Sequence, residues 1–172
     1  MIKTLLYLAA FLTLFTLEVS FIHALPTPLD RMPLVITGVV FLYLYVDFPA
    51  VLWWLIFHGI LLQVFALSFT PFQLIAYIAA AAVTVLASRH VFSNRSFYGV
   101  ASTTALAVAT ILFVEITLSL GGSFFGQIPV PFGTLLHVRL WGIVLSALAL
   151  LLLFPLSTKL RGALHSLFQH YT

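Results

Sequence analysis

The sequence contains no cysteine and very few charged residues. The absence of cysteine excludes disulfides, thiolate metal ligands and cysteine nucleophiles. Charged residues make up only 6% of the 172 residues, whereas a soluble domain contains about 25%. Seven basic and four acidic side chains cannot cover the surface of a water-soluble globule, and 63% of the residues are hydrophobic. We therefore expect an all-α domain that is embedded in a membrane and contacts its lipids.

Recognisable catalytic motifs are also missing. The sequence has no HExxH or GxSxG motif, no cluster with metal-ligand spacing and no catalytic pair of carboxylates. It has no basic face that would bind nucleic acid, although its pI is near 9.5. We therefore expect no cofactor, no metal and no nucleic-acid partner, and nothing in the sequence argues for an enzyme.

Apolar runs separated by short polar or proline-rich segments predict a polytopic helical bundle with six transmembrane helices. The first run follows Lys3 as in a signal peptide, but it has spanning length and contains Glu18, which favours a helix. The segment 25–33 holds three prolines and is predicted to be a loop. The predicted helices are 4–24, 34–46, 50–69, 72–88, 97–120 and 134–156.

The second run, 34–46, is too short for an ordinary transmembrane helix. Thirteen residues reach about 20 Å, whereas the hydrocarbon core is about 30 Å thick. The run is either a short span, which we favour, or half of a re-entrant hairpin. Asp47 is expected to cap the next helix, with Pro49 in its first turn.

The end of the chain and its basic residues indicate an orientation. Gly121 and Gly122 are expected to end the fifth helix. Residues 1–158 are expected to form the bundle, and 159–172 a short amphipathic cytoplasmic tail, because leucines recur there at helical spacing beside basic residues. The positive-inside rule places both termini in the cytoplasm, since one side of the bundle would carry Lys3, Arg89, Arg95, Lys159 and Arg161.

Polar residues inside the apolar runs are the candidate site. In the predicted topology they lie at one depth, near the outer leaflet, and charged groups at such depths usually pair. Glu115 and Arg139 are expected to meet as a buried pair, with either a structural or a partner-binding role. His58 is expected to be a packing or interfacial residue rather than a ligand. The predicted polar cluster consists of Glu18, Gln63, Glu115, His137 and Arg139.

Small residues mark two helix-packing faces. Arg139, Gly142, Ser146 and Ala149 share one side of the last helix. In the hairpin 52–95, a face with Gly59, Gln63 and Ala66 is expected to oppose an alanine ridge formed by Ala76, Ala79, Ala80 and Ala87. We expect this hairpin to be the packing centre of the bundle.

Three stretches resemble the rod shape-determining protein MreD family of small bacterial inner-membrane proteins. LEVSFIHALPTPLDRMPLVI resembles the family's polar residue late in the first helix, followed by a proline-containing loop. HGILLQVFALSFTPFQLIAYIAAAAVTVLASRHVF resembles its hairpin with an alanine-rich second helix and a basic end. RLWGIVLSALALLLLFPLSTKLR resembles its final helix. The chain departs from the family at Gln63, where the family has aspartate, and at 68–70, where the turn glycines are replaced.

The resemblance implies a fold similar to the S-components of energy-coupling-factor transporters. It also implies a non-enzymatic scaffold of the bacterial inner membrane, acting in cell-shape maintenance and peptidoglycan elongation with MreC-like and other wall-elongation membrane proteins as partners. The first alternative is a substrate-binding membrane component of a vitamin-type transporter, which would use an outer cavity of several hundred Å3. A membrane enzyme is a third possibility.

Overall fold

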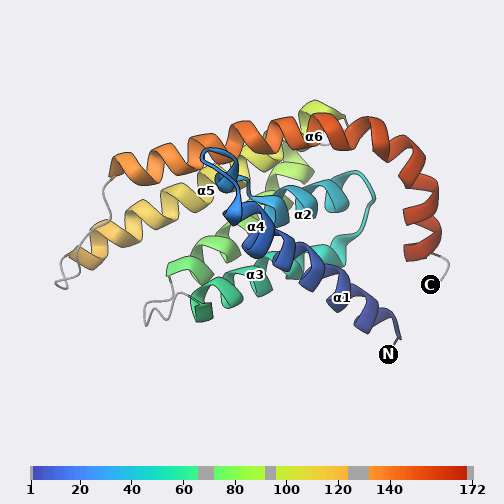
Figure 1. The fold of residues 1–172 in the computed structure, drawn as a ribbon, viewed down its shortest axis with the longest axis horizontal. Coiled ribbons are helices and arrows are strands. Elements are labelled where there is room, and N and C mark those ends of the chain that lie inside the picture. The colour runs from blue at the N-terminus through green and yellow to red at the C-terminus, as the bar shows by residue number, and fades with distance from the viewer. Residues whose placement is uncertain (1, 66–71, 92–95, 124–131, 170–172) are drawn as a thin grey trace.

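The computed structural model describes residues 2–65, 72–91, 96–123 and 132–169. These residues form helices and turns without any strand, so the predicted all-α class is confirmed. Figure 1 shows the helices packed side by side, with the beginning of α1 and the end of α6 at the same end of the molecule. Among the described residues, four helices are long and apolar enough to cross a membrane: Tyr7–Ala24, Phe72–His90, Phe97–Gly121 and Phe132–Pro155.

The first helical segment begins as α1 (Ile2–Thr16) and changes its winding toward its end. It continues as a π-helical turn, η1 (Leu17–Phe21), and a 3-10 turn, η2 (Ile22–Ala24). The predicted helix 4–24 is therefore present, and Glu18 lies in the π-helical turn, a feature that is frequent at functional sites. The proline-rich segment that follows contains one short 3-10 turn, η3 (Leu29–Arg31).

The short helix α2 (Leu34–Leu44) has only 11 residues, which confirms the predicted short run. Six of these residues are buried, and apolar side chains lie on every side of the helix. The helix therefore lies inside the protein. At 1.5 Å per residue, α2 is about 16 Å long. The described helices of the hairpin 52–95 make the most extensive helix contacts, in agreement with its predicted role in packing, and α2 belongs to the same core.

The connection between α2 and α3 differs from the predicted cap. Asp47 is not the cap residue; it adopts a left-handed backbone with φ of 64°, and Phe48 precedes the 3-10 turn η4 (Pro49–Val51). Pro49 does occupy the first position of that turn, where its missing N–H costs nothing. The helix α3 (Leu52–Phe65) follows, and the predicted continuation to residue 69, including Ala66, lies outside the described residues.

The predicted close packing between α3 and α4 (Phe72–His90) is present. A Cβ atom placed on Gly59 would lie 2.9 Å from the Cβ of Tyr77 and 3.3 Å from the Cα of Leu74. Ala76, Ala80 and Ala87 are buried along α4, but the residues nearest to Gly59 are Leu74 and Tyr77 rather than the predicted alanines. The absence of a side chain at Gly59 therefore sets the distance between these two helices.

The last two helices extend beyond their predicted ends. α5 (Phe97–Ser123) continues through Gly121 and Gly122, so these glycines do not end it. α6 (Phe132–Gln169) contains Pro155 and runs on without a break, and Figure 1 shows it turning away near its end. The backbone of 159–169, which was predicted to be a separate tail, is thus the final part of α6. The side chains of this segment are not among those the structure describes, so the amphipathic face stays a prediction.

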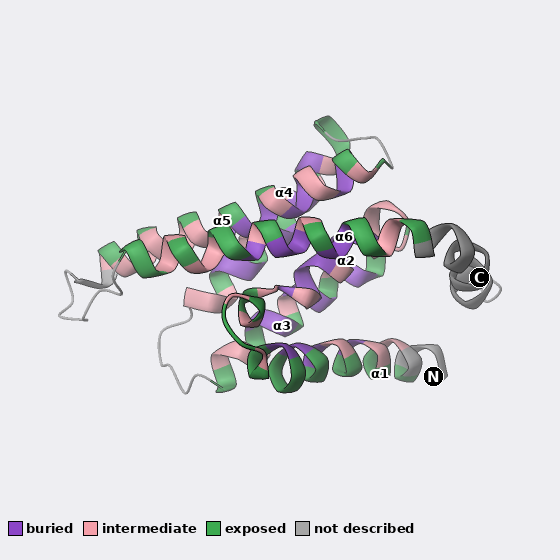
Figure 2. Cartoon of the chain, turned by 45° about the horizontal axis from the view of Figure 1, so that its top comes forward, coloured by how far each residue is buried: buried purple, intermediate pink, exposed green. Residues whose placement is uncertain are grey.

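The distribution of burial is that of a protein surrounded by lipid. Figure 2 shows buried residues where helices face one another and exposed residues along the outer sides of α1, α5 and α6. Many of those exposed side chains are large and apolar, for example Leu12, Phe113 and Leu148. Together with the four long apolar helices, this surface identifies the chain as a membrane protein.

Candidate functional site

The carboxylate of Glu18 lies at the start of the short helix α2. Glu18 is only 6% exposed, and its Oε2 accepts a hydrogen bond of 2.5 Å from the backbone N–H of Val35. Pro33, at the position before α2, has no side-chain group that caps the helix. Because the first N–H groups of a helix have no partner within it and carry partial positive charge, an anion is favoured there. Glu18 therefore caps α2 from a neighbouring helix.

The predicted contact between Glu115 and Arg139 is present and joins α5 to α6. The Nε of Arg139 donates to Oε2 of Glu115 at 3.1 Å, and the Nη2 of Arg139 donates to Oε1. Two parallel N–H···O bonds are the strongest arrangement for this pair of groups. Arg139 also interacts with Tyr77 of α4 and attracts Glu18 electrostatically. One guanidinium thus connects α4, α5, α6 and the end of the first helical segment.

His58 lies beside Glu18 and is completely buried. Its ring packs edge-on against Phe15, with a centroid distance of 5.6 Å, and against Tyr77 at 4.9 Å. Its Nε2 lies 3.6 Å from Oε1 of Glu18, and neither ring nitrogen forms a hydrogen bond with the described residues. His58 is a packing residue, as expected, but its place beside a carboxylate was not predicted.

The proline-rich loop enters the bundle and packs against α6. A Cβ atom on Gly142 would lie 3.3 Å from the carbonyl oxygen of Arg31, and the hydroxyl of Thr37 donates to that of Ser146 at 3.1 Å. Within the loop, the Nε of Arg31 lies 3.1 Å from Oδ2 of Asp30. The small-residue face of α6 therefore receives the loop and the first turn of α2, which brings Asp30 and Arg31 to the depth of Arg139.

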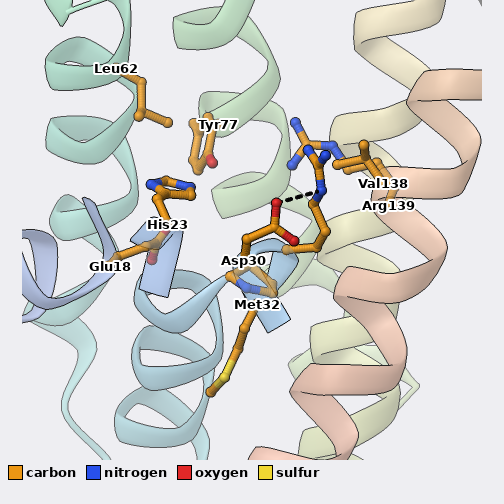
Figure 3. A pocket seen from close by; sticks show the side chains of 10 residues that line it. Glu18, His23, Asp30, Met32, Leu62, Tyr77, Val138 and Arg139 are labelled. Carbon is orange, nitrogen blue, oxygen red and sulfur yellow. Dashed lines mark ion pairs between the residues drawn. The ribbon is translucent and has the colours of Figure 1, made fainter. Parts of the chain in front are cut away.

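These groups surround a small cavity of about 140 Å3. Figure 3 shows Glu18 and His23 on one side of it, Arg139 on the other, and Tyr77 and Asp30 between them. Charged and polar groups share the lining with apolar side chains. The lining residues are Glu18, His23, Asp30, Arg31, Met32, Pro33, Leu62, Tyr77, Val138 and Arg139.

The structure brings together three of the five predicted cluster residues. Glu18 and Arg139 line the cavity, and Glu115 is bound to Arg139. Gln63 is half-buried on α3, next to the lining residue Leu62, but does not itself line the cavity. His137 is exposed on α6 and contacts the ring of Trp141, with a centroid distance of 6.4 Å, so it lies apart from the others.

Sequence reasoning missed several residues of this site. Asp30 and Arg31 lie between prolines, and nothing in the sequence indicates that their loop returns into the bundle. Tyr77 lies in an alanine-rich apolar run, where a tyrosine is usually a packing residue. The only available signal was the short length of α2, because a helix of 11 residues leaves room for a loop at one end.

The charged groups of the site form ion pairs and hydrogen bonds with other groups of the chain. Among the described residues, no group of three or more His, Cys, Asp or Glu side chains could hold a metal ion. The cavity is smaller than the about 300–1,000 Å3 of typical small-molecule pockets. The arrangement can hold helices together and receive one small polar group.

Comparison with known proteins finds no matching protein family, curated protein or solved structure. The inferences below therefore depend on the sequence and the geometry alone.

Proposed function

We propose that this protein is a non-enzymatic scaffold of the bacterial inner membrane that resembles MreD. In this proposal it acts in cell-shape maintenance and peptidoglycan elongation, by binding MreC-like and other wall-elongation membrane proteins. It crosses the membrane several times with both termini in the cytoplasm, which agrees with the beginning of α1 and the end of α6 lying at the same end of the molecule in Figure 1.

The observation that supports a scaffold best is that the charged groups around the cavity pair with groups of the bundle itself. Arg139 pairs with Glu115, Glu18 is bound by the N-terminus of α2, and the half-buried Asp30 pairs with the exposed Arg31. A binding site for a soluble substrate usually holds its polar groups ready for the ligand, in a pocket of about 300–1,000 Å3. Here the charged groups already join the helices, and the space left between them is about 140 Å3.

The alternative, a substrate-binding component of a vitamin-type transporter, has one observation in its favour. The cavity lies among charged groups at the depth where such a component would bind its ligand. Its volume of about 140 Å3 is too small for a vitamin-sized molecule without movement of the helices.

Partner recovery from membranes tests the proposal. The tagged full-length protein is purified from gently solubilised membranes after crosslinking, and the recovered proteins are identified. We expect MreC-like and other wall-elongation proteins to be enriched, and depletion of the protein to produce rounded cells. Recovery of an ATPase pair, together with uptake of a vitamin that depends on this protein, would establish the transporter instead.

A pair of variants links partner recovery to the cluster. Glu115→Gln leaves Arg139 without its carboxylate, so we expect lower partner recovery per amount of folded protein. Leu148→Val is the control, because Leu148 is exposed on α6 and is not part of the polar cluster. Equal recovery with both variants would show that the Glu115–Arg139 pair has no part in partner binding.

A further inference from the structure

The charged groups that line the cavity balance one another. The acidic lining residues are Glu18 and Asp30, and the basic ones are Arg31 and Arg139. Asp30 lies beside Arg31, and Glu18 is bound by the start of α2 and attracted by Arg139. A lining without excess charge of either sign favours neither a cation nor an anion. It favours an occupant that is neutral and dipolar.

The same groups keep hydrogen-bonding capacity that their ion pairs do not use. The guanidinium of Arg139 has more N–H donors than the two that donate to Glu115. The carboxylate of Glu18 has about four acceptor sites, of which the backbone at the start of α2 uses only part. Lipid chains can neither donate nor accept hydrogen bonds, whereas water serves donors and acceptors alike. The lining is therefore suited to water.

The cavity reaches from exposed residues into the interior of the bundle. Of its lining residues, His23 and Arg31 are exposed, whereas Glu18 and Tyr77 are buried. Figure 3 shows side chains of both kinds around one space. The side chain of Glu18 keeps 8% exposure, so it is not sealed off completely. In the proposed topology the exposed end, at the loop 25–33, faces the outer side of the membrane.

We propose that this cavity is a water-filled inlet, which opens at the loop 25–33 and brings water to Glu18 within the membrane-spanning part of the bundle. Its volume of about 140 Å3 is sufficient, since one water molecule needs about 10–15 Å3 and a few polar partners. Charged side chains in transmembrane segments usually face the protein interior or a water-filled cavity, and water here lowers the cost of keeping these charges in the membrane. The inlet does not depend on the scaffold function.

Water contact can be measured on the unmodified full-length protein. The isotope-labelled chain is reconstituted in liposomes whose lipid chains are deuterated, and solid-state NMR follows magnetisation transfer from water protons to methyl groups. Val138 and Leu140 form a matched pair, because they lie on either side of Arg139 at nearly the same depth of α6. Val138 lines the cavity, whereas Leu140 is 52% exposed and does not line it.

We expect transfer from water to Val138 to be about threefold faster than transfer to Leu140, since Leu140 faces lipid and Val138 faces the inlet. The order would be reversed if exposure of the isolated chain decided the rate. Equal transfer to the two residues, or slower transfer to Val138, shows that the cavity is dry and overturns the inference.

Two substitutions by phenylalanine test whether the cavity is the route of the water. Val138→Phe fills the cavity and should slow transfer from water to the side chains of Glu18 and Tyr77 about threefold. Leu140→Phe enlarges a side chain outside the cavity and should leave that transfer unchanged. Where Val138→Phe reduces folding, Leu62→Phe fills the cavity from α3 instead. Unchanged transfer in a folded variant with a filled cavity overturns the inference.

The occupant and the proposed scaffold function are distinguished by separate measurements. Transfer to Val138 should be equal at low and high concentrations of sodium chloride, and a loss at high salt would assign the cavity to an ion instead of water. A dry cavity overturns the inlet and leaves the scaffold proposal standing. Failure to recover wall-elongation proteins contradicts the scaffold proposal and leaves the inlet standing.

Discussion

Arg139 is the residue on which the buried polar groups converge. Its guanidinium is bound by Glu115, contacts Tyr77 and attracts Glu18, so it joins groups from four helical segments. A charged side chain at the centre of a bilayer costs roughly 2.5–3.5 kcal/mol on insertion scales. Here only 20% of the Arg139 side chain and 13% of the Glu115 side chain are exposed, so each charge depends on the other.

Breaking this pair should therefore destabilise the fold strongly. We expect Arg139→Gln to lower the free energy of unfolding by about 3–5 kcal/mol, because it leaves the Glu115 carboxylate buried without its cation. Reversible unfolding in mixed micelles measures this change. The double variant Glu115→Gln/Arg139→Gln should lose less than the sum of the two single variants, and strict additivity would contradict a direct coupling.

Glu18 acts on the backbone at the start of α2. In Glu18→Ala the N–H of Val35 loses its acceptor, and we expect a cost of about 1–3 kcal/mol for the buried group left unpaired. Hydrogen exchange of the Val35 amide, which should become faster, provides the local measurement. Glu18→Gln retains a side-chain oxygen and should show a smaller change; equal exchange in all three chains would show that Glu18 does not cap α2.

At the scale of elements, the short helix α2 depends on its neighbours at both ends. Its N-terminus begins inside the bundle at Glu18, and near its other end the hydroxyl of Tyr43 accepts a hydrogen bond of 3.4 Å from Ser88 of α4. A helix that reaches only part of the way across a membrane needs protein or water around its free backbone groups. The loop 25–33 and the Glu18 carboxylate lie beside the free backbone groups at the N-terminus of α2.

The contact between α3 and α4 is controlled by one missing side chain. In Gly59→Ala the added methyl would lie 2.9 Å from the Cβ of Tyr77, so the helices must separate, and we expect destabilisation of about 1–3 kcal/mol. Gly121→Ala is the matched control, because an added Cβ there meets nothing within 4 Å and alanine favours the helix. Thermal unfolding compares the two, and equal stability would contradict close packing at Gly59.

Helix ends were the least predictable elements, for a physical reason. Gly121 and Gly122 favour a helix end only through local backbone freedom, and in a lipid environment the hydrogen bonds of a continued helix outweigh that preference. The same reasoning applies to α6, which passes Pro155 without ending. By contrast, the short length of α2 was readable directly, because it is set by the length of an apolar run.

For the whole molecule, the absence of cysteine makes the proposed orientation measurable. Single cysteines can be introduced into the chain and tested with a thiol reagent that does not cross the membrane. We expect Thr27→Cys to react in intact spheroplasts, and His90→Cys to react only after the cytoplasmic side is opened, since both side chains are exposed and lie on opposite sides in the proposed topology. The reverse pattern would place the termini outside the cytoplasm.

The composition and the positions of the polar residues alone predicted the class of protein and part of the site. A chain with 6% charged residues must place most of its surface in lipid, and the few charges within its helices must meet one another, as Glu115 and Arg139 do. The cavity could not be predicted, because it depends on a loop that packs against a distant helix. Thr37 and Ser146, which mark that contact, are 109 residues apart.

That long-range contact has a consequence for how the protein is made. The loop 25–33 and the start of α2 rest on Gly142 and Ser146, which are synthesised after α1 to α5. The first third of the chain, which also packs on α3 and α5, therefore lacks this one contact until α6 has left the ribosome and entered the bilayer. Insertion of α6 consequently completes the surroundings of α2.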